Sequence, residues 1–304
     1  MVDWANLETE QRNPNSDHID EVSALDICRI INREDAGVAS AVEGALPAVA
    51  AAVDLVADSL RAGGRLFYLG AGTSGRLGVL DASECPPTYS TDPSIVQGLI
   101  AGGEAAVFGA VEGAEDDARG AVEPLSSRGL DPPDVVVGIA ASGVTPFVIG
   151  GLQYARERGC STALLCCSPG AEKGVDVDVA IVVPVGPEVI TGSTRMKAGT
   201  ATKLVLNMVS TGAMVLLGKT FGNLMVDLQP KSAKLRDRSG RILTTLTGLT
   251  PCEAAIRLRQ SGWDLKLALV MELCNLEPGA ARERLLRYSG HLKQALGRHT
   301  EHPS

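Results

Sequence analysis

Residues 65–87 constrain the fold more than any other part of the chain, because they combine three local patterns without a break. Arg65–Leu69 is mostly apolar, as expected of a strand buried on both faces. A turn rich in glycine, Gly70–Gly75, follows it directly. Arg76–Ala82 is compatible with a helix, which Pro86 and Pro87 are expected to end. This unit directs free backbone N–H groups and the positive end of a helix toward an anion.

The glycine turn allows three interpretations. It could be a tight connection that needs glycine only for its dihedral angles. Gly70, Gly72 and Gly75 also satisfy the loose pattern of a dinucleotide site, but no acidic residue ends a clear second strand about 20 residues later. Thr73 and Ser74 add two hydroxyl groups within the turn, which suits a phosphate better than a bare glycine turn would.

The same pattern, an apolar strand followed by a turn of small hydroxyl residues and the start of a helix, recurs along the chain. Asp134–Ala140 precedes a turn with Ser142 and Thr145, and the turn before a long helix at Met196–Leu217 contains Ser193 and Thr194. We call these, with Thr73–Ser74, the three hydroxyl turns. Helix capping is the commoner role of such residues, but turns at the carboxyl ends of parallel strands converge where ligands bind. Three further strands are expected, at Val96–Ile100, Ser161–Cys167 and Val179–Val183.

These patterns predict an α/β fold with a doubly wound, mostly parallel sheet and a small C-terminal helical module. Residues 1–244 are expected to form the main domain, with N-terminal helices at Ile19–Asn32 and at Ala36–Leu60, the latter split by Pro47. Residues 222–240 are polar and rich in turn residues. Residues 245–304 are expected to form three short helices, Pro251–Gln260, Asp264–Cys274 and Pro278–Ala295.

Composition narrows the classes of function. The net charge is −8, and no basic run is present, so nucleic acid is not an expected partner. The 7 cysteines form no C-x-x-C pair, and the 4 histidines lack paired ligand spacing, so reduced thiols and no metal site are expected. No unbroken apolar run approaches about 20 residues, so we expect a cytoplasmic protein without a membrane partner.

Five stretches together resemble the N-acetylmuramic acid 6-phosphate etherase family, which belongs to the sugar-isomerase (SIS) phosphosugar-binding superfamily. They are Gly70–Pro87, Gly102–Asp117, Asp134–Pro146, Thr191–Lys203 and Gly222–Asp227 with the following Lys234-Leu235. The resemblance implies an SIS domain, a homodimer and no metal or organic cofactor. It implies cleavage of the D-lactyl ether of N-acetylmuramate 6-phosphate to N-acetylglucosamine 6-phosphate and D-lactate, in cell-wall recycling and amino-sugar catabolism.

The resemblance also implies two catalytic carboxyl groups. Glu84, in the sequence DASECPP, matches the proton donor to the departing lactyl oxygen, and Glu115, in EGAED, matches the second carboxylate. We assign the deprotonation of sugar carbon C2 to Glu115 as a hypothesis, because that hydrogen lies next to the aldehyde of the open-chain sugar. The phosphosugar is expected to contact Gly72, Thr73, Ser74, Ser142, Thr145, Ser193 and Thr194.

Two positions depart from the family's pattern. Val144 stands where many relatives carry Arg, and Ser232 stands where relatives often carry Asn, which affects affinity and substrate breadth more than the reaction. The alternative from another class is a non-catalytic phosphosugar-sensing regulator of the SIS type, which would need only the hydroxyl turns. An aldose–ketose isomerase would also use a base at C2, but without loss of lactate.

Overall fold

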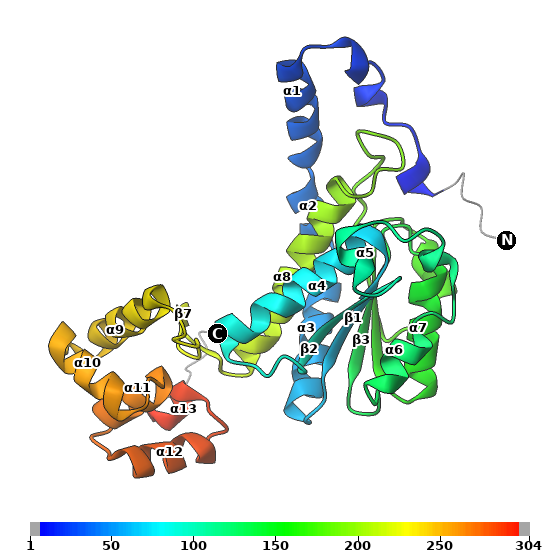
Figure 1. The fold of residues 1–304 in the computed structure, drawn as a ribbon. Coiled ribbons are helices and arrows are strands. Elements are labelled where there is room, and N and C mark those ends of the chain that lie inside the picture. The colour runs from blue at the N-terminus through cyan, green and yellow to red at the C-terminus, as the bar shows by residue number, and fades with distance from the viewer. Residues whose placement is uncertain (1–6, 298–304) are drawn as a thin grey trace. The chain divides into compact units, whose positions relative to one another are not determined.

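The computed structural model describes residues 7–297. A parallel sheet of five strands forms the centre of the N-terminal part of the chain (Figure 1). The strands are β1 (Leu66–Gly70), β2 (Val96–Ile100), β3 (Val135–Ile139), β4 (Ser161–Cys166) and β5 (Val179–Val182). Their order is β2-β1-β3-β4-β5, and every neighbouring pair is parallel. This confirms the predicted fold class and the positions of the five strands.

Helices cover both faces of this sheet. On one face α6 (Val122–Ser127) and α7 (Pro146–Glu157) bury a core with the inward side chains of β1, β3 and β4. On the other face α3 (Leu46–Arg61) packs on several strands and α4 (Gly72–Tyr89) packs on β1, where a Cβ atom on Gly78 would lie 2.9 Å from Cβ of Tyr68. The apolar runs of the strands are therefore buried on both sides, as the sequence pattern predicts.

The remaining helices of this part include α1, which has no buried side chain and extends away from the sheet (Figure 1). They are α1 (Ala24–Asp35), α2 (Val38–Gly44), α5 (Ala105–Phe108) and α8 (Lys197–Leu216), with short 3₁₀ turns η2 (Glu8–Glu10), η3 (Pro14–Ser16), η4 (Ile19–Glu21), η5 (Ala114–Asp116) and η6 (Ala171–Gly174). The predicted break at Pro47 is observed, since α2 ends at Gly44 and Pro47 lies in the first turn of α3.

The chain divides into two compact units. The N-terminal unit consists of Met1–Ser83 and Pro93–Gly212, and the C-terminal unit of Glu84–Asp92 and Ala213–Ser304. This division lies earlier in the chain than the expected boundary near residue 245. Helices α4 and α8 each contribute residues to both units.

The C-terminal unit contains a short hairpin and a group of helices around an apolar core. Its elements are β6 (Thr220–Phe221), β7 (Leu224–Met225), α9 (Ala233–Thr247), α10 (Pro251–Gln260), α11 (Leu265–Leu273), α12 (Pro278–Arg287) and α13 (Leu292–Ala295). Buried Lys266 joins the loops of this unit. Its ammonium group donates to the carbonyl groups of Gly218 and Gly290 at 3.0 and 2.9 Å and to Asp227 at 2.8 Å.

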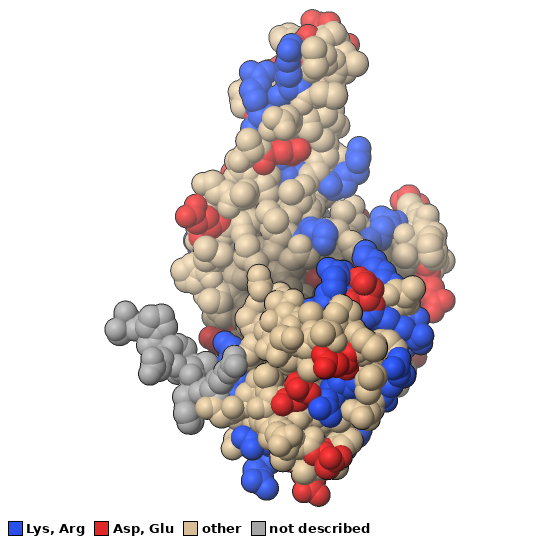
Figure 2. Space-filling view, turned by 90° about the vertical axis from the view of Figure 1, so that its left-hand side faces the viewer, with Lys and Arg blue, Asp and Glu red and all other residues tan. Residues whose placement is uncertain are grey.

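On the face drawn in Figure 2, basic side chains are interspersed with acidic ones.

Three sequence-based expectations are corrected. The helix expected at Pro278–Ala295 is two helices, α12 and α13. Pro86 and Pro87 do not end α4, which starts at Gly72 and continues to Tyr89. The helix continues past both prolines although each lacks an N–H donor, and the N–H of Ser90 donates to the carbonyl of Pro86 at 3.0 Å. The polar segment 222–240 was expected to be rich in turns, but its later part forms the beginning of α9. Ser232 is the N-cap of this helix, and its side chain accepts a hydrogen bond from the N–H group of Leu235.

Among the described residues, no single helix is long and apolar enough to cross a membrane. One bent pair, Ala24–Gly44 with Leu46–Arg61 at 62°, meets the criteria of length and composition.

Candidate active site

The order of the strands places the ends of β1 and β3 at the point where the sheet's winding direction reverses. β2 lies on one side of β1 and β3 on the other, and Gly70 at the end of β1 is paired with Ile139 at the end of β3. The turns after these two strands therefore leave the sheet side by side. In open parallel sheets, the crevice at this place is the usual location of a ligand.

The turn between β1 and α4 needs its glycines for two different reasons. Gly72 has a φ of +52°, in the left-handed region, although a side chain there would meet nothing within 4 Å. Gly70 and Gly75 are needed for close approach, because a Cβ atom on Gly70 would lie 2.6 Å from the nitrogen of Gly75 and one on Gly75 would lie 2.6 Å from the carbonyl oxygen of Gly70. The turn is thus folded tightly against the first residues of α4, which include Thr73 and Ser74.

The turn between β3 and α7 carries Ser142 and Thr145. The hydroxyl of Ser142 accepts from the N–H of Val144 at 3.4 Å, and Gly143 adopts a φ of +78°. Thr145 occupies the N-cap position of α7, but its side chain makes no capping hydrogen bond. The capping interpretation, which the sequence left open, therefore does not hold for the Thr145 hydroxyl.

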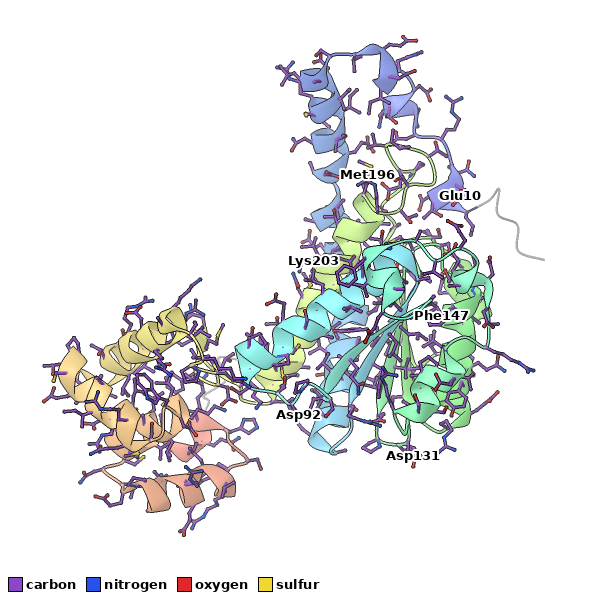
Figure 3. The ribbon with its side chains drawn as sticks, viewed as in Figure 1. Glu10, Asp92, Asp131, Phe147, Met196 and Lys203 are labelled. Atoms are coloured by element: carbon purple, nitrogen blue, oxygen red, sulfur yellow. The ribbon has the colours of Figure 1, made fainter. Side chains whose placement is uncertain are left out.

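The turn with Ser193 and Thr194 comes close to the first one at the start of α8. A Cβ atom on Gly199 would lie 3.5 Å from Cγ2 of Thr73 and 3.5 Å from the carbonyl oxygen of Thr194. The turn also faces the N-terminal segment, since a Cβ atom on Gly192 would lie 3.3 Å from Oε2 of Glu10 (Figure 3). The structure thus brings together the turns that carry Thr73 and Thr194, from widely separated parts of the chain.

A buried carboxylate that sequence reasoning missed holds the start of α8. Glu188 is 0% exposed, and its two oxygens accept from the N–H groups of Lys197 at 3.0 Å and Ala198 at 2.9 Å. Burial raises the pKa of Glu188, and these N–H groups and the Lys197 charge oppose that rise. The first N–H groups of α8 are therefore occupied by a protein side chain, and are not free to bind a ligand.

Lys197 connects this helix start to the N-terminal segment. Its ammonium group donates to Glu34 at 2.8 Å, and Glu34 also accepts from Asn13 at 2.7 Å and Asn15 at 2.9 Å. Although burial favours the neutral acid, these hydrogen bonds outweigh it and lower the pKa of Glu34. Asn13 also donates to the carbonyl of Pro187 at 3.0 Å. Asn13, Asn15 and Glu34 lie in polar stretches of the sequence, and no local pattern there indicates this cluster.

Glu115 is exposed and lies in η5, after Gly113, which has a φ of +73°. The segment that follows packs closely on α7, because a Cβ atom on Gly120 would lie 3.1 Å from Cδ2 of Phe147 (Figure 3). A cavity of about 790 Å³ lies beside η5, and Ala114, Asp117 and Phe147 are among its lining residues. Arg76 of α4 fixes the loop before η5 by donating to the carbonyl groups of Val107 and Gly109 at 2.9 and 3.1 Å.

Glu84 is an exposed residue in the later part of α4. It belongs to the C-terminal unit, whereas Glu115 and the hydroxyl turns belong to the N-terminal unit. Among the described residues, no cluster of three or more His, Cys, Asp or Glu side chains has the arrangement of a metal site.

Comparison with known proteins identifies the family. Residues 48–156 match the family model of the glucokinase regulatory protein N-terminal SIS domain. The chain is 54% identical to an N-acetylmuramic acid 6-phosphate etherase of Gloeobacter violaceus over 97% of both chains, and 53% identical to one of Serratia proteamaculans over 96% of this chain and 98% of that one. A phosphoheptose isomerase structure from Francisella tularensis shares the fold, with 15% identity and a TM-score of 0.50, covering 64% of this chain and 100% of that one. The chain belongs to the N-acetylmuramic acid 6-phosphate etherase family.

Proposed function

We propose that this protein cleaves the D-lactyl ether of N-acetylmuramic acid 6-phosphate, giving N-acetylglucosamine 6-phosphate and D-lactate. The observation that carries the proposal is the identity of 54% to a relative of that name over 97% of both chains. We place the reaction in peptidoglycan recycling and amino-sugar catabolism in the cytoplasm, and propose a homodimer as the working form.

In this proposal the phosphate group lies at the glycine turn after β1. The first N–H groups of α4 have no acceptor within the helix, and the positive end of the helix favours an anion. The hydroxyls of Thr73, Ser74, Ser142 and Thr145 supply further donors. Since Glu188 occupies the N–H groups at the start of α8, we assign the phosphate to α4 and assign to the turn before α8 only the hydroxyls of Ser193 and Thr194.

The reaction proceeds on the open-chain form of the sugar. Glu115 removes the C2 proton, which is acidic because C2 lies next to the C1 aldehyde. The electron pair left at C2 forms the C2–C3 double bond as the C3–O bond breaks. Glu84 gives its proton to the departing lactyl oxygen, since an unprotonated alkoxide is a poor leaving group. Water then adds at C3 and a proton returns to C2, so that two carboxyl groups suffice for the whole sequence.

The test is D-lactate release by the purified protein in ²H₂O or H₂¹⁸O, with a chelator present. We expect deuterium at C2 and ¹⁸O at C3 of the product sugar. Glu84→Gln and Glu115→Gln should each lose at least about a hundredfold in kcat, as expected for a general acid or base. Glu43→Gln, an exposed residue on α2, is the matched control and should keep full activity.

Other results would overturn the proposal. Binding of the phosphosugar by wild-type protein without lactate release would indicate a regulator, and exchange at C2 with isomerisation but no lactate would indicate an isomerase. Sedimentation of the active protein as a monomer would contradict the homodimer.

A further inference from the structure

Asp81 is a buried carboxylate in the same sequence, DASECPP, that carries Glu84, and the proposed reaction gives it no role. It lies on α4 and is 7% exposed. The hydroxyl of Tyr68 on β1 donates to Oδ2 of Asp81 at 3.0 Å, and the hydroxyl of Ser210 on α8 donates to Oδ1 at 3.1 Å. One side chain therefore ties α4 both to the central strand and to a neighbouring helix.

These contacts satisfy the polar atoms of a buried side chain. Leaving one of the Asp81 oxygens unpaired in a buried place is costly. Tyr68 and Ser210 are themselves buried, at 1% and 5% exposed, so water cannot readily replace either donor. Two hydroxyl groups, one from β1 and one from α8, therefore help to fix the position of α4 at this point.

The sequence of α4 makes such an anchor necessary. Gly72, Gly75 and Gly78 have low helix propensity, and Pro86 and Pro87 remove two backbone donors from the last turns. Glu84 lies between the glycines and the prolines, in a stretch where backbone hydrogen bonding alone holds the helix weakly. Residues spaced by three lie on adjacent turns of a helix, so Asp81 is the anchored neighbour of Glu84.

We propose that Asp81 is a positioning residue for Glu84. It sets the direction of the α4 turn that presents the Glu84 carboxyl group to the departing lactyl oxygen, while Asp81 itself does not touch the substrate. This inference rests on the proposed function, in which Glu84 is the proton donor. It predicts that disturbing the Asp81 contacts affects the breaking of the C3–O bond more than phosphate binding or C2 deprotonation.

The test uses the two donors, because their substitution leaves the carboxylate in place. Ser210→Ala and Tyr68→Phe each remove one hydroxyl group with little change in volume. Ser59→Ala is the matched control: Ser59 is also buried, at 7% exposed, and donates to the carbonyl of Pro133 at 2.7 Å, away from α4. Urea unfolding of all three variants establishes that they fold.

Two readouts distinguish positioning from general destabilisation. We expect Ser210→Ala and Tyr68→Phe to lower kcat for lactate release about tenfold or more, with KM changed less than twofold, because a small misplacement of a reacting group is expensive. In ²H₂O, the ratio of C2 deuterium exchange in unreacted substrate to lactate release should rise severalfold. Ser59→Ala should show the wild-type kcat and the wild-type ratio.

The inference is wrong if wild-type protein releases lactate and both donor variants fold but keep the kcat and exchange ratio of Ser59→Ala. A higher KM with an unchanged kcat in both donor variants would also overturn it. If the wild-type protein releases no lactate at all, the proposed function fails first. If one donor variant does not fold, the other decides the outcome by the same two readouts.

Discussion

The ammonium nitrogen of Lys197 lies 2.8 Å from Oε2 of Glu34, and the two side chains are only 5% and 14% exposed. The pair joins the first residue of α8 to the end of α1. Glu34 also accepts from Asn13 and Asn15, so both of its carboxylate oxygens have a protein donor. The hydroxyl turn before α8 therefore depends on the N-terminal segment for its support.

Removing the charge of Lys197 should lower the stability of the folded protein. Lys197→Met leaves the partly buried Glu34 carboxylate without its ion-pair partner, and we expect the free energy of unfolding to fall by about 2 kcal/mol. Arg29→Met, which breaks the exposed pair of Arg29 with Asp26 on α1, should leave the free energy of unfolding nearly unchanged. Urea denaturation measures both. Equal effects would show that the Lys197–Glu34 pair is no more than a surface pair.

Glu188 gives stability a pH dependence of a defined sign. Its pKa is raised above the usual 4.5 by burial, so the folded state holds the proton more tightly than the unfolded state. The contribution of Glu188 to the free energy of unfolding is fully present below pH 4.5 and is lost as the pH rises through the raised pKa. We expect Glu188→Gln to lack this decline, whereas Glu43→Gln, at an exposed site, should follow the wild-type curve. Parallel urea-unfolding curves for all three proteins between pH 4.5 and about 8 would contradict the assignment.

The glycines of the first turn should differ in what they tolerate. Gly72→Ala forces a left-handed φ on alanine without a clash, and should cost about 1 kcal/mol of stability. Gly75→Ala should cost about 3 kcal/mol, because the new Cβ would lie 2.6 Å from both the carbonyl oxygen of Gly70 and Cγ1 of Ile100. Gly44→Ala, with open space around it, is the control and should cost nothing. Thermal unfolding ranks the three; the reverse order of Gly72 and Gly75 would refute this account.

Thr145 and Thr250 offer a contrast between a ligand contact and a cap. Both occupy N-cap positions, but only Thr250 forms a capping box, with Glu253 of α10. We expect Thr145→Ala to raise KM for the phosphosugar severalfold with stability within about 0.5 kcal/mol of wild type. Thr250→Ala should lose about 1 kcal/mol of stability and keep its KM. A stability loss in Thr145→Ala without a change in KM would return Thr145 to a structural role.

The sheet could be predicted because its strands are short apolar runs bounded by turn residues. Val135–Ile139 is buried along its whole length, and no local alternative competes with a buried strand there. The meeting of the turns after β1 and β3 also followed from the sequence, since parallel strands end at one edge. The ligand contacts of the hydroxyl residues and the roles of Glu84 and Glu115 stay predictions.

Features that depend on distant contacts could not be predicted. The course of α4 through Pro86 and Pro87 contradicts local propensity. Cys85 and Tyr89, on either side of the prolines, are buried, and this tertiary packing is not visible in the local sequence. The cluster of Glu34, Lys197 and Glu188 joins residues far apart in the chain, and nothing in their local sequence distinguishes them from solvated charges. Helix α9 was missed because its exposed residues are polar and its buried ones, such as Ile242 and Leu243, are few.

The C-terminal unit takes residues from two places in the chain, and this limits how the gene can be divided. A fragment that starts at Ala213 lacks Glu84–Asp92, including Ser90, whose hydroxyl donates to the carbonyl of Asp227. The complementary fragment would keep that piece without its packing partners. We therefore expect recombination between relatives at residue 213 to preserve both units only when the exchanged segments agree at residues 84–92 as well.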